Sequence, residues 1–403
     1  MKRAICFVLS ILLLISITGC LSKANVIKLS EGIEQEAPKR VKIDEPFIAA
    51  QQDFAMNLYR AEADRHSENF CLSPYSISVA LSLAANGAEG ETKAEFEDVL
   101  TGRIAIQDWN RYMYSYSKKQ DSSLKSANSV WFDNGFKIKD DYLHRVVNSY
   151  GTDIFLANFH SSETVDSINN WVKESTNGKI ENILEELHPN SQMYLANATV
   201  FSAKWTTTHK ESDVKDEIFS SRSGKKSTVK MMYSKEKTYL KDDDAVGVIK
   251  ELAGDCSFVA LMPDENIDIK DYIKQLTAEK LRNILAKKES VNVNTGVPYF
   301  STETDTQLKD SLTDIGIKSA FLEEKADFTG IADKKLFINN AQHKTRIYVD
   351  AYGIKAAAST GVEIITMGIT PAPEKEVILN RPFIYFIMDS YNVPLFMGVV
   401  TEL

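Results

Sequence analysis

The 403-residue chain is poor in the residue types from which metal and catalytic sites are built. It has four cysteines and six histidines, and no group of them has the spacing of zinc ligands. It has no Gly-x-Ser-x-Gly, no His-Glu-x-x-His and no phosphate-binding glycine-rich loop. The histidines have no partnered nucleophile in the sequence. We therefore do not expect an enzyme, a metal or a cofactor.

A basic surface is missing as well. The net charge is −9, and the lysine pairs Lys118-Lys119, Lys225-Lys226 and Lys334-Lys335 are isolated from one another. Nucleic acids require a basic face, so we do not expect them as partners, and each lysine pair is interpreted as solvated surface. Hydrophobic residues make up 43% and charged residues 26% of the chain, which is typical of a packed globular core. No repeat, low-complexity tract or linker follows residue 45, so one domain is expected.

The chain begins with a short apolar run. Lys2 and Arg3 precede it, and it extends from Ile5 to Ile17. This run is shorter than the about 20 residues of a membrane span and fits a secretory signal. It ends in Ile-Thr-Gly-Cys20, which resembles the lipobox of a prokaryotic lipoprotein, where Cys20 would become the lipid-bearing N-terminus. Ordinary signal cleavage beside an incidental cysteine is the alternative.

We therefore divide the chain into a signal peptide (1–20), a tether (21–45) and one domain (46–403). The tether is predicted because this stretch mixes charges with few large apolar residues. The expected location is extracytoplasmic, either as a membrane-anchored lipoprotein or as a secreted protein. Beyond the signal peptide, Cys71 and Cys256 lie in apolar runs, which predicts buried thiols; a disulfide has no support from their spacing.

The periodicity of apolar residues predicts helices early in the chain and strands late, without βαβ alternation. This order is typical of an α+β fold. The runs 383–388 and 395–400 are continuously apolar, which predicts strands buried on both faces. The expected helices cover 47–58, 77–84, 96–100, 165–172 and 268–288, and the expected strands cover 70–72, 126–132, 193–201, 246–252, 256–262, 291–300, 336–340, 344–350, 383–388 and 395–400.

Several segments resemble signatures of the serpin family, and they occur in the family's order across residues 46–403. The resemblance implies three β-sheets with about nine helices and an exposed reactive loop near the C-terminus, which the large central sheet can accept as an extra strand. The segments are 69–77 (NFCLSPYSI), 197–205 (NATVFSAKW), 327–331 (DFTGI) followed by 343–350, 380–383 (NRPF) and 394–398 (PLFMG).

The same resemblance assigns residues to two regions of the central sheet. Ser73, Ser76, Asn197 and His343 match the shutter, where the sheet opens, and buried polar groups there must find partners. Trp205 matches the breach, where the loop first inserts. The plainer alternatives are a helix cap for Ser73, a satisfied core histidine for His343 and a core aromatic for Trp205.

The reactive loop would span about 350–379. Its alternation places Ile354, Ala356, Ala358, Thr360, Val362 and Ile364 on one, mostly apolar face, which is the pattern of a half-buried strand. By resemblance the hinge consists of Gly353, Ile354, Lys355, Ala356, Ala357, Ala358, Ser359 and Thr360. Two residues depart from the inhibitory pattern: Ile354 stands where a small hydroxyl residue is usual, and Ala351 stands where an acidic residue is usual.

Counting along the loop as in the family places the scissile bond between Met367 and Gly368. Methionine before that bond suits the apolar pockets of chymotrypsin-, elastase- or subtilisin-like proteases, and a shift to Thr366 or Ile365 would favour elastase-like ones. The implied function is suicide inhibition of a serine protease through a covalent acyl complex, by a metastable monomer; a cysteine protease is the second class of partner. The alternative is a non-inhibitory serpin that acts as a binding or chaperone-like protein.

Overall fold

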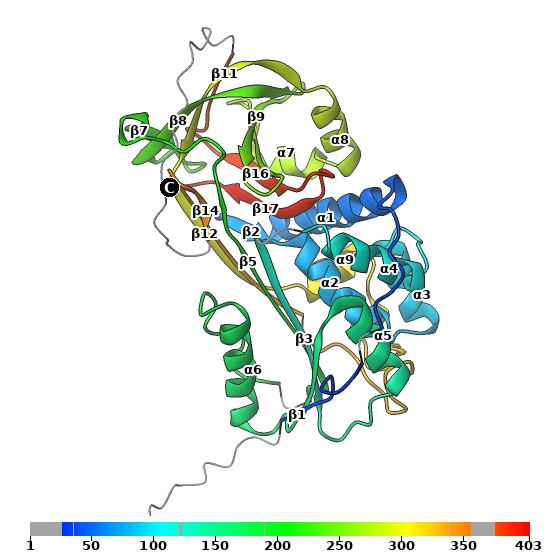
Figure 1. Ribbon diagram of the computed structural model, residues 1–403. Coiled ribbons are helices and arrows are strands. Elements are labelled where there is room, and N and C mark those ends of the chain that lie inside the picture. Colours follow the sequence, from blue (N-terminus) through cyan, green and yellow to red (C-terminus); the bar gives the residue numbers. More distant parts are fainter. Residues whose placement is uncertain (1–25, 35, 121–122, 189, 340, 356–374) are drawn as a thin grey trace, which may run out of the picture.

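The computed structural model describes residues 26–34, 36–120, 123–188, 190–339, 341–355 and 375–403 (Figure 1). The helices are α1 Glu45–Arg65, α2 Pro74–Ala85, α3 Gly90–Val99, α4 Ile106–Ser117, α5 Asp140–Tyr150, α6 Ser162–Ser175, α7 Ile269–Gln275, α8 Ala278–Ala286 and α9 Lys309–Ile315. The strands are β1 Ile27–Lys28, β2 Phe70–Leu72, β3 Leu124–Asp133, β4 Asp153–Ala157, β5 Met193–Phe201, β6 Ala203–Lys204, β7 Val214–Ser220, β8 Lys226–Lys241, β9 Ala245–Leu252, β10 Cys256–Pro263, β11 Glu289–Pro298, β12 Phe300–Gln307, β13 Gln342–Asp350, β14 Gly353–Lys355, β15 Lys375–Ile378, β16 Phe383–Met388 and β17 Pro394–Val400.

The large sheet has eight strands in the order β1-β4-β3-β5-β13-β14-β6, with β12 also paired to β13. Two long antiparallel ladders form its halves. In one half β3 and β5 pair over nine residues, and in the other β12 and β13 pair over eight. The halves are joined by parallel pairing of β13 with β5. In Figure 1, β3 and β5 run side by side diagonally through the molecule.

The remaining strands form a second hydrogen-bonded set, β15-β11-β8-β9-β10-β16-β17-β2, with β7 on β8. The 16-residue β8 belongs to two layers, because it pairs with β7 and β11 along most of its length and with β9 only through its last residues. The predicted strands 383–388 and 395–400 are confirmed as β16 and β17, and both are buried on both faces. The α+β prediction is confirmed.

The helices that position the large sheet lie on opposite faces of it. On one face, Ile168 and Val172 of α6 pack into an apolar cluster with Trp131 and Tyr194 of the sheet. On the other face lies α2, which is buried at every residue; Figure 1 shows α6 apart from the group α1–α5 across the strands β3 and β5. Because α2 is surrounded by protein, any polar group on it needs a partner within the fold.

Three predicted elements differ from the structure. The strand predicted over 291–300 is β11 only as far as Pro298, and Phe300 already belongs to β12. The helix predicted over 268–288 is two helices, α7 and α8, because Leu276 leaves the helical conformation and Thr277 caps a new helix by accepting a hydrogen bond from the Lys280 N–H at 3.1 Å. The strand predicted over 336–340 is wrong, because residues 336–339 have no ladder partner and the strand begins at Gln342.

The predicted tether, 21–45, is described from residue 26 and is held against the domain. Ile27 and Lys28 add a short strand to the edge of β4, and Lys28 Nζ lies 2.8 Å from Asp153 Oδ1. This part of the tether is therefore not a free spacer, because its backbone and one of its charges are paired with the sheet. The division at residue 45 and the signal peptide 1–20 stay predictions. None of the helices in the described ranges is long and apolar enough to cross a membrane.

Candidate functional site

The start of the predicted hinge is already a strand of the large sheet. Gly353, Ile354 and Lys355 form β14, which pairs antiparallel with β13 on one side and with β6 on the other. The register places Ile354 opposite Val349 and Ala203. The Ile354 side chain is fully buried and belongs to the main core cluster. The bulky residue at this position is therefore accommodated inside the sheet.

Gly353 fits its position because it has no side chain. Its φ is +148°, a conformation that favours glycine. A Cβ at this position would also meet backbone atoms of β6, the Ala203 carbonyl oxygen and Lys204 Cα. Those atoms belong to a paired strand and cannot move aside as a flexible side chain could. The glycine thus permits the close approach between β14 and β6.

The turn before β14 is held by Asp350. One carboxylate oxygen of Asp350, Oδ1, accepts hydrogen bonds from the backbone N–H of Tyr352 at 2.8 Å and of Gly353 at 3.2 Å. This is an aspartate turn, in which the side chain binds its own backbone two and three residues on. Ala351 stands where an acidic residue is usual, and in this chain the acidic residue is Asp350, one position earlier.

Trp205, the predicted breach residue, is buried and binds the same turn. Its Nε1–H donates to the Asp350 carbonyl oxygen at 2.8 Å, and its backbone N–H donates to the Tyr352 carbonyl at 3.1 Å. The alternative of a plain core aromatic does not describe it, because the indole nitrogen contacts the backbone where the hinge begins.

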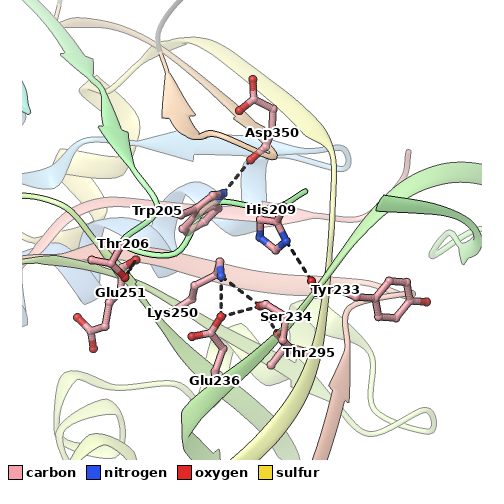
Figure 2. A network of polar contacts seen from close by, with 10 residues as sticks. All are labelled: Trp205, Thr206, His209, Tyr233, Ser234, Glu236, Lys250, Glu251, Thr295 and Asp350. Atoms are coloured by element: carbon pink, nitrogen blue, oxygen red, sulfur yellow. Dashed lines mark hydrogen bonds and ion pairs between the residues drawn. The ribbon is translucent and has the colours of Figure 1, made fainter. Parts of the chain in front are cut away.

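Beneath Trp205 lies a buried lysine (Figure 2). Lys250 Nζ is 5.0 Å from the centroid of the Trp205 ring and 2.6 Å from Glu236 Oε1, and it donates to Ser234 Oγ at 3.1 Å. The Lys250 side chain is only 2% exposed, so its charge depends on these partners. A cation over the indole face also stabilises the orientation of the ring.

His209 packs against the edge of the same group. Its ring makes a T-shaped contact with Trp205, with the centroids 6.5 Å apart, and Nδ1 lies 3.0 Å from the Tyr233 carbonyl oxygen. Burial, reinforced by the charge of Lys250, lowers the pKa of His209 to about 4. The imidazole is therefore neutral at pH 7, and Nδ1 carries the proton that it donates to Tyr233.

The predicted shutter residues form two linked pairs on the first turn of α2. In one pair, Asn197 Oδ1 accepts from Ser76 Oγ at 2.8 Å, and Asn197 Nδ2 donates to the Ser76 carbonyl at 3.0 Å. Asn197 also donates to Asn128 Oδ1 at 2.6 Å, and the Ser76 hydroxyl contacts that of Thr199. This network ties α2 to both β3 and β5.

The second pair joins α2 to β13. His343 Nε2 accepts the backbone N–H of Ser73 at 3.1 Å, so the neutral ring carries its hydrogen on Nδ1. Burial lowers the pKa of His343 to about 4. The Ser73 hydroxyl donates to the Leu395 carbonyl at 2.9 Å and does not cap the helix, although Ser73 occupies the N-cap position. The cap alternative for Ser73 is therefore wrong.

The seam between the two halves of the large sheet is short. It consists of the pairs Lys344–Ala198 and Thr345–Thr199. On the β12–β13 side, the buried His343 Nδ1 has no hydrogen-bond partner among the described residues. Unpaired buried polar atoms are costly, so hydrogen bonding is less complete on this side of the seam than within the two flanking ladders.

Several predicted site residues lie outside the described residues. They are Cys20, Ala356, Ala357, Ala358, Ser359, Thr360, Met367 and Gly368, and for Lys355 only the backbone is described. Cys71 and Cys256 are buried and form no disulfide, and burial raises the pKa of Cys71 to about 12. Within the described ranges no three His, Cys, Asp or Glu side chains could hold a metal ion.

The sequence analysis did not single out Asp350, Lys250, Glu236 or Thr199. Two signals were available. Lys250, followed by Glu251, interrupts the apolar strand Val246 to Leu252, and a lysine on such a strand needs a charged partner if it is buried. Asp350 directly precedes a turn, where aspartate commonly binds the backbone.

This arrangement agrees with the comparisons with known proteins. A family model described as Serpin (serine protease inhibitor) matches residues 49–403. A serpin-like protein of Thermococcus kodakarensis is 32% identical over 371 residues, covering 88% of this chain and 85% of that protein. Leukocyte elastase inhibitor A of Mus musculus is 32% identical over 381 residues, covering 88% and 99% of the two chains. The chain belongs to the serpin family.

Solved structures agree on the fold. The thermophilic serpin tengpin in its native state superimposes with a TM-score of 0.87 and 39% identity, covering 94% of this chain and all of that one. Tengpin in its latent state gives a TM-score of 0.80 at 36% identity, covering 91% and 100%. The described part of this chain is thus more similar to the native form than to the latent one.

Proposed function

We propose that the chain inhibits a serine protease as a suicide substrate. The protease serine attacks the Met367 carbonyl carbon and forms an acyl-enzyme, and the bond to Gly368 breaks with release of the new amino terminus at Gly368. The freed segment from Gly353 to Met367 then enters the large sheet and carries the acylated protease with it. Distortion of the catalytic site prevents water from completing hydrolysis.

The observation that carries this proposal is β14. Its residues already lie between β13 and β6 with Ile354 buried, so insertion would extend an existing strand. Continuing the β13–β14 register would place Ala356 opposite Ile347, Ala358 opposite Thr345 and Thr360 opposite His343. The inserted segment would then replace β5 as the partner of β13 at the seam.

A buried polar atom beside the seam supports a metastable starting form. His343, whose Nδ1 has no hydrogen-bond partner among the described residues, lies along the expected insertion path. An incoming strand brings backbone N–H and C=O groups and the hydroxyl of Thr360 into that region. Insertion would therefore add hydrogen bonds, each contributing about 1 kcal/mol, where the uninserted sheet lacks them.

The target class follows from the residue before the bond. Met367 suits the apolar pockets of chymotrypsin-, elastase- and subtilisin-like proteases and not a pocket that carries a carboxylate. Inhibition of an elastase is named for the mouse relative, which supports an elastase-like target within this class. A cysteine protease, which would form a thioester in place of the ester, is the second class of partner.

The test mixes the soluble domain with chymotrypsin, elastase or subtilisin and looks for a complex that survives boiling in detergent. Ala358→Arg, which would place a charge against the buried Thr345, should leave loop cleavage intact and abolish the complex. Ala357→Arg is the matched control, because by alternation it lies on the opposite face and should still trap. Complete cleavage by every protease without a complex would instead indicate a non-inhibitory serpin with a binding role.

For localisation we propose a lipid anchor at Cys20. The support is the Ile-Thr-Gly-Cys20 sequence at the end of the apolar run. Expression of the full chain in a bacterium and mass spectrometry of its mature N-terminus should give an acylated Cys20. Release of a Cys20→Ser variant into the medium is expected, while a mature wild-type chain that begins at another residue without lipid would contradict the anchor.

A further inference from the structure

The hinge is connected to the body of the protein by one continuous chain of contacts. Glu236 on β8 pairs with Lys250 on β9, Lys250 lies over the face of Trp205, and Trp205 donates to the Asp350 carbonyl. Asp350 is the last residue in this series of contacts before the hinge. Its main chain is held by Trp205, while its side chain holds the backbone of the residues that follow.

The Asp350 side chain determines where β14 begins. Because one oxygen accepts from both Tyr352 and Gly353, the turn places Gly353 opposite Asp350 and Ile354 opposite Val349. Every residue inserted after Ile354 takes its register from this starting pair. In a strand, a slip of one residue moves each side chain to the other face.

Such a slip would reverse the faces of the inserting segment. In the observed register Ile354 is buried, and by alternation Ala356, Ala358 and Thr360 follow it inward. One residue out of register, Lys355 and Glu363 would point inward instead, and burying unpaired charges is strongly unfavourable. Insertion in the wrong register would therefore stall while the acyl-enzyme hydrolyses.

We infer that Asp350 is a positioning residue of the inhibitory reaction, whose aspartate turn fixes the register of loop insertion and so decides between trapping and release of the protease. The inference rests on the proposed inhibitory function. Both hydrogen bonds to the turn go to one oxygen, Oδ1, so we expect the position of that oxygen to be the determinant. Asparagine presents an oxygen at the same place, whereas glutamate keeps the charge but moves the oxygens one methylene further out.

The test compares wild type with Asp350→Asn, Asp350→Glu and Asp350→Ala, and with Asp243→Ala as a matched control at an exposed acidic residue. For each variant, the rate of loop cleavage and the ratio of cleaved to trapped inhibitor are measured with the same protease. We expect the ratio to change less than about twofold for Asn and to rise about tenfold for Glu and Ala, as for the loss of the hydrogen bonds of the turn. The cleavage rate should be unchanged throughout, since Met367 is far from the turn in the chain.

Hydrogen exchange of the intact inhibitor gives a readout that does not depend on trapping. The amides of Tyr352 and Gly353 should exchange faster in the Glu and Ala variants than in wild type and Asn, with the amides of β16 unchanged. Thermal unfolding shows whether each variant is folded, and the Asn and Glu pair decides the matter if Asp350→Ala does not fold. If the ratio of cleaved to trapped inhibitor rises for Asp350→Asn and is unchanged for Asp350→Glu, or if it is equal in all variants, the inference is wrong and the proposed inhibitory function is unaffected. A wild-type inhibitor that traps no protease would refute the proposed function itself, and the inference with it.

Discussion

Replacing Ile354 by threonine separates two explanations of the hinge. The family pattern has a small hydroxyl residue at this position, which predicts that threonine would insert more readily. The structure predicts no such gain, because Ile354 is already inside the sheet as part of β14 and fully buried. Residue 354 has then entered the sheet before the protease arrives, so its substitution affects the intact and the inserted forms alike.

The magnitude follows from the burial of the side chain. Ile354→Val removes one methylene and should cost the folded protein, intact or inserted, about 0.5–1.5 kcal/mol. Ile354→Thr has nearly the shape of valine but adds a buried hydroxyl, which costs about 1–3 kcal/mol if it finds no partner. The total for threonine is about 2–4 kcal/mol of the free energy of unfolding. Because residue 354 is buried before and after insertion, this cost cancels from the balance between trapping and release.

The assay is the number of inhibitor molecules consumed for each protease molecule trapped. We expect this number to be nearly equal for wild type, Val and Thr, while the free energy of unfolding of the intact protein, measured by urea denaturation, decreases in that order. The rate of loop cleavage should be equal in all three, because the reactive bond is unchanged. The argument from burial would be refuted if fewer inhibitor molecules were consumed for each protease molecule trapped with the threonine variant than with wild type.

Three further predictions follow from the described geometry. Burial holds the pKa of both His209 and His343 at about 4, compared with an ordinary value of 6.5, so the unfolded chain binds protons that the folded chain does not as the pH falls from 6.5 to 4. The free energy of unfolding should be highest above pH 6.5 and decrease across this window by up to a few kcal/mol for each histidine. A flat urea-denaturation profile between pH 7 and 4.5 would contradict this. Lys250→Met should lower thermal stability by about 2 kcal/mol, because Glu236 loses its partner, whereas Lys235→Met on the exposed side of the same sheet should change little; equal melting temperatures would show that the buried ion pair contributes nothing. Nicking the loop should raise the melting temperature above that of the intact chain, since the freed segment adds a strand, and two identical melting curves would exclude insertion.

The parts of the fold that could be predicted are those in which the apolar residues of one continuous stretch of sequence already indicate burial. The strands 193–201 and 383–388 were predicted with their observed ends, because each is mostly apolar and buried on both faces. The break between α7 and α8 was not, since Leu276 and Thr277 include neither glycine nor proline, the usual signals of an interruption.

The candidate site divides in the same way. Ser73, Ser76, Asn197, His343 and Trp205 were predicted from family motifs, and the structure brings the first four together on α2 and its neighbours. The role of Asp350 was missed because its partner Trp205 lies 145 residues earlier in the chain. Lys250 was missed because its partners, Glu236 and the Trp205 ring, come from other segments that meet it only in the folded protein.

The two-residue seam has a mechanical consequence. The β3–β5 and β12–β13 ladders are each several times longer than the pairing of β13 with β5 that joins them. A strand that enters from the β14 end would therefore separate β13 from β5 and leave both ladders intact. The first pair to separate would be Thr345–Thr199, and Thr199 also touches the Ser76 hydroxyl. Separating β13 from β5 at this pair would therefore also act on the contact that ties the first turn of α2 to β5.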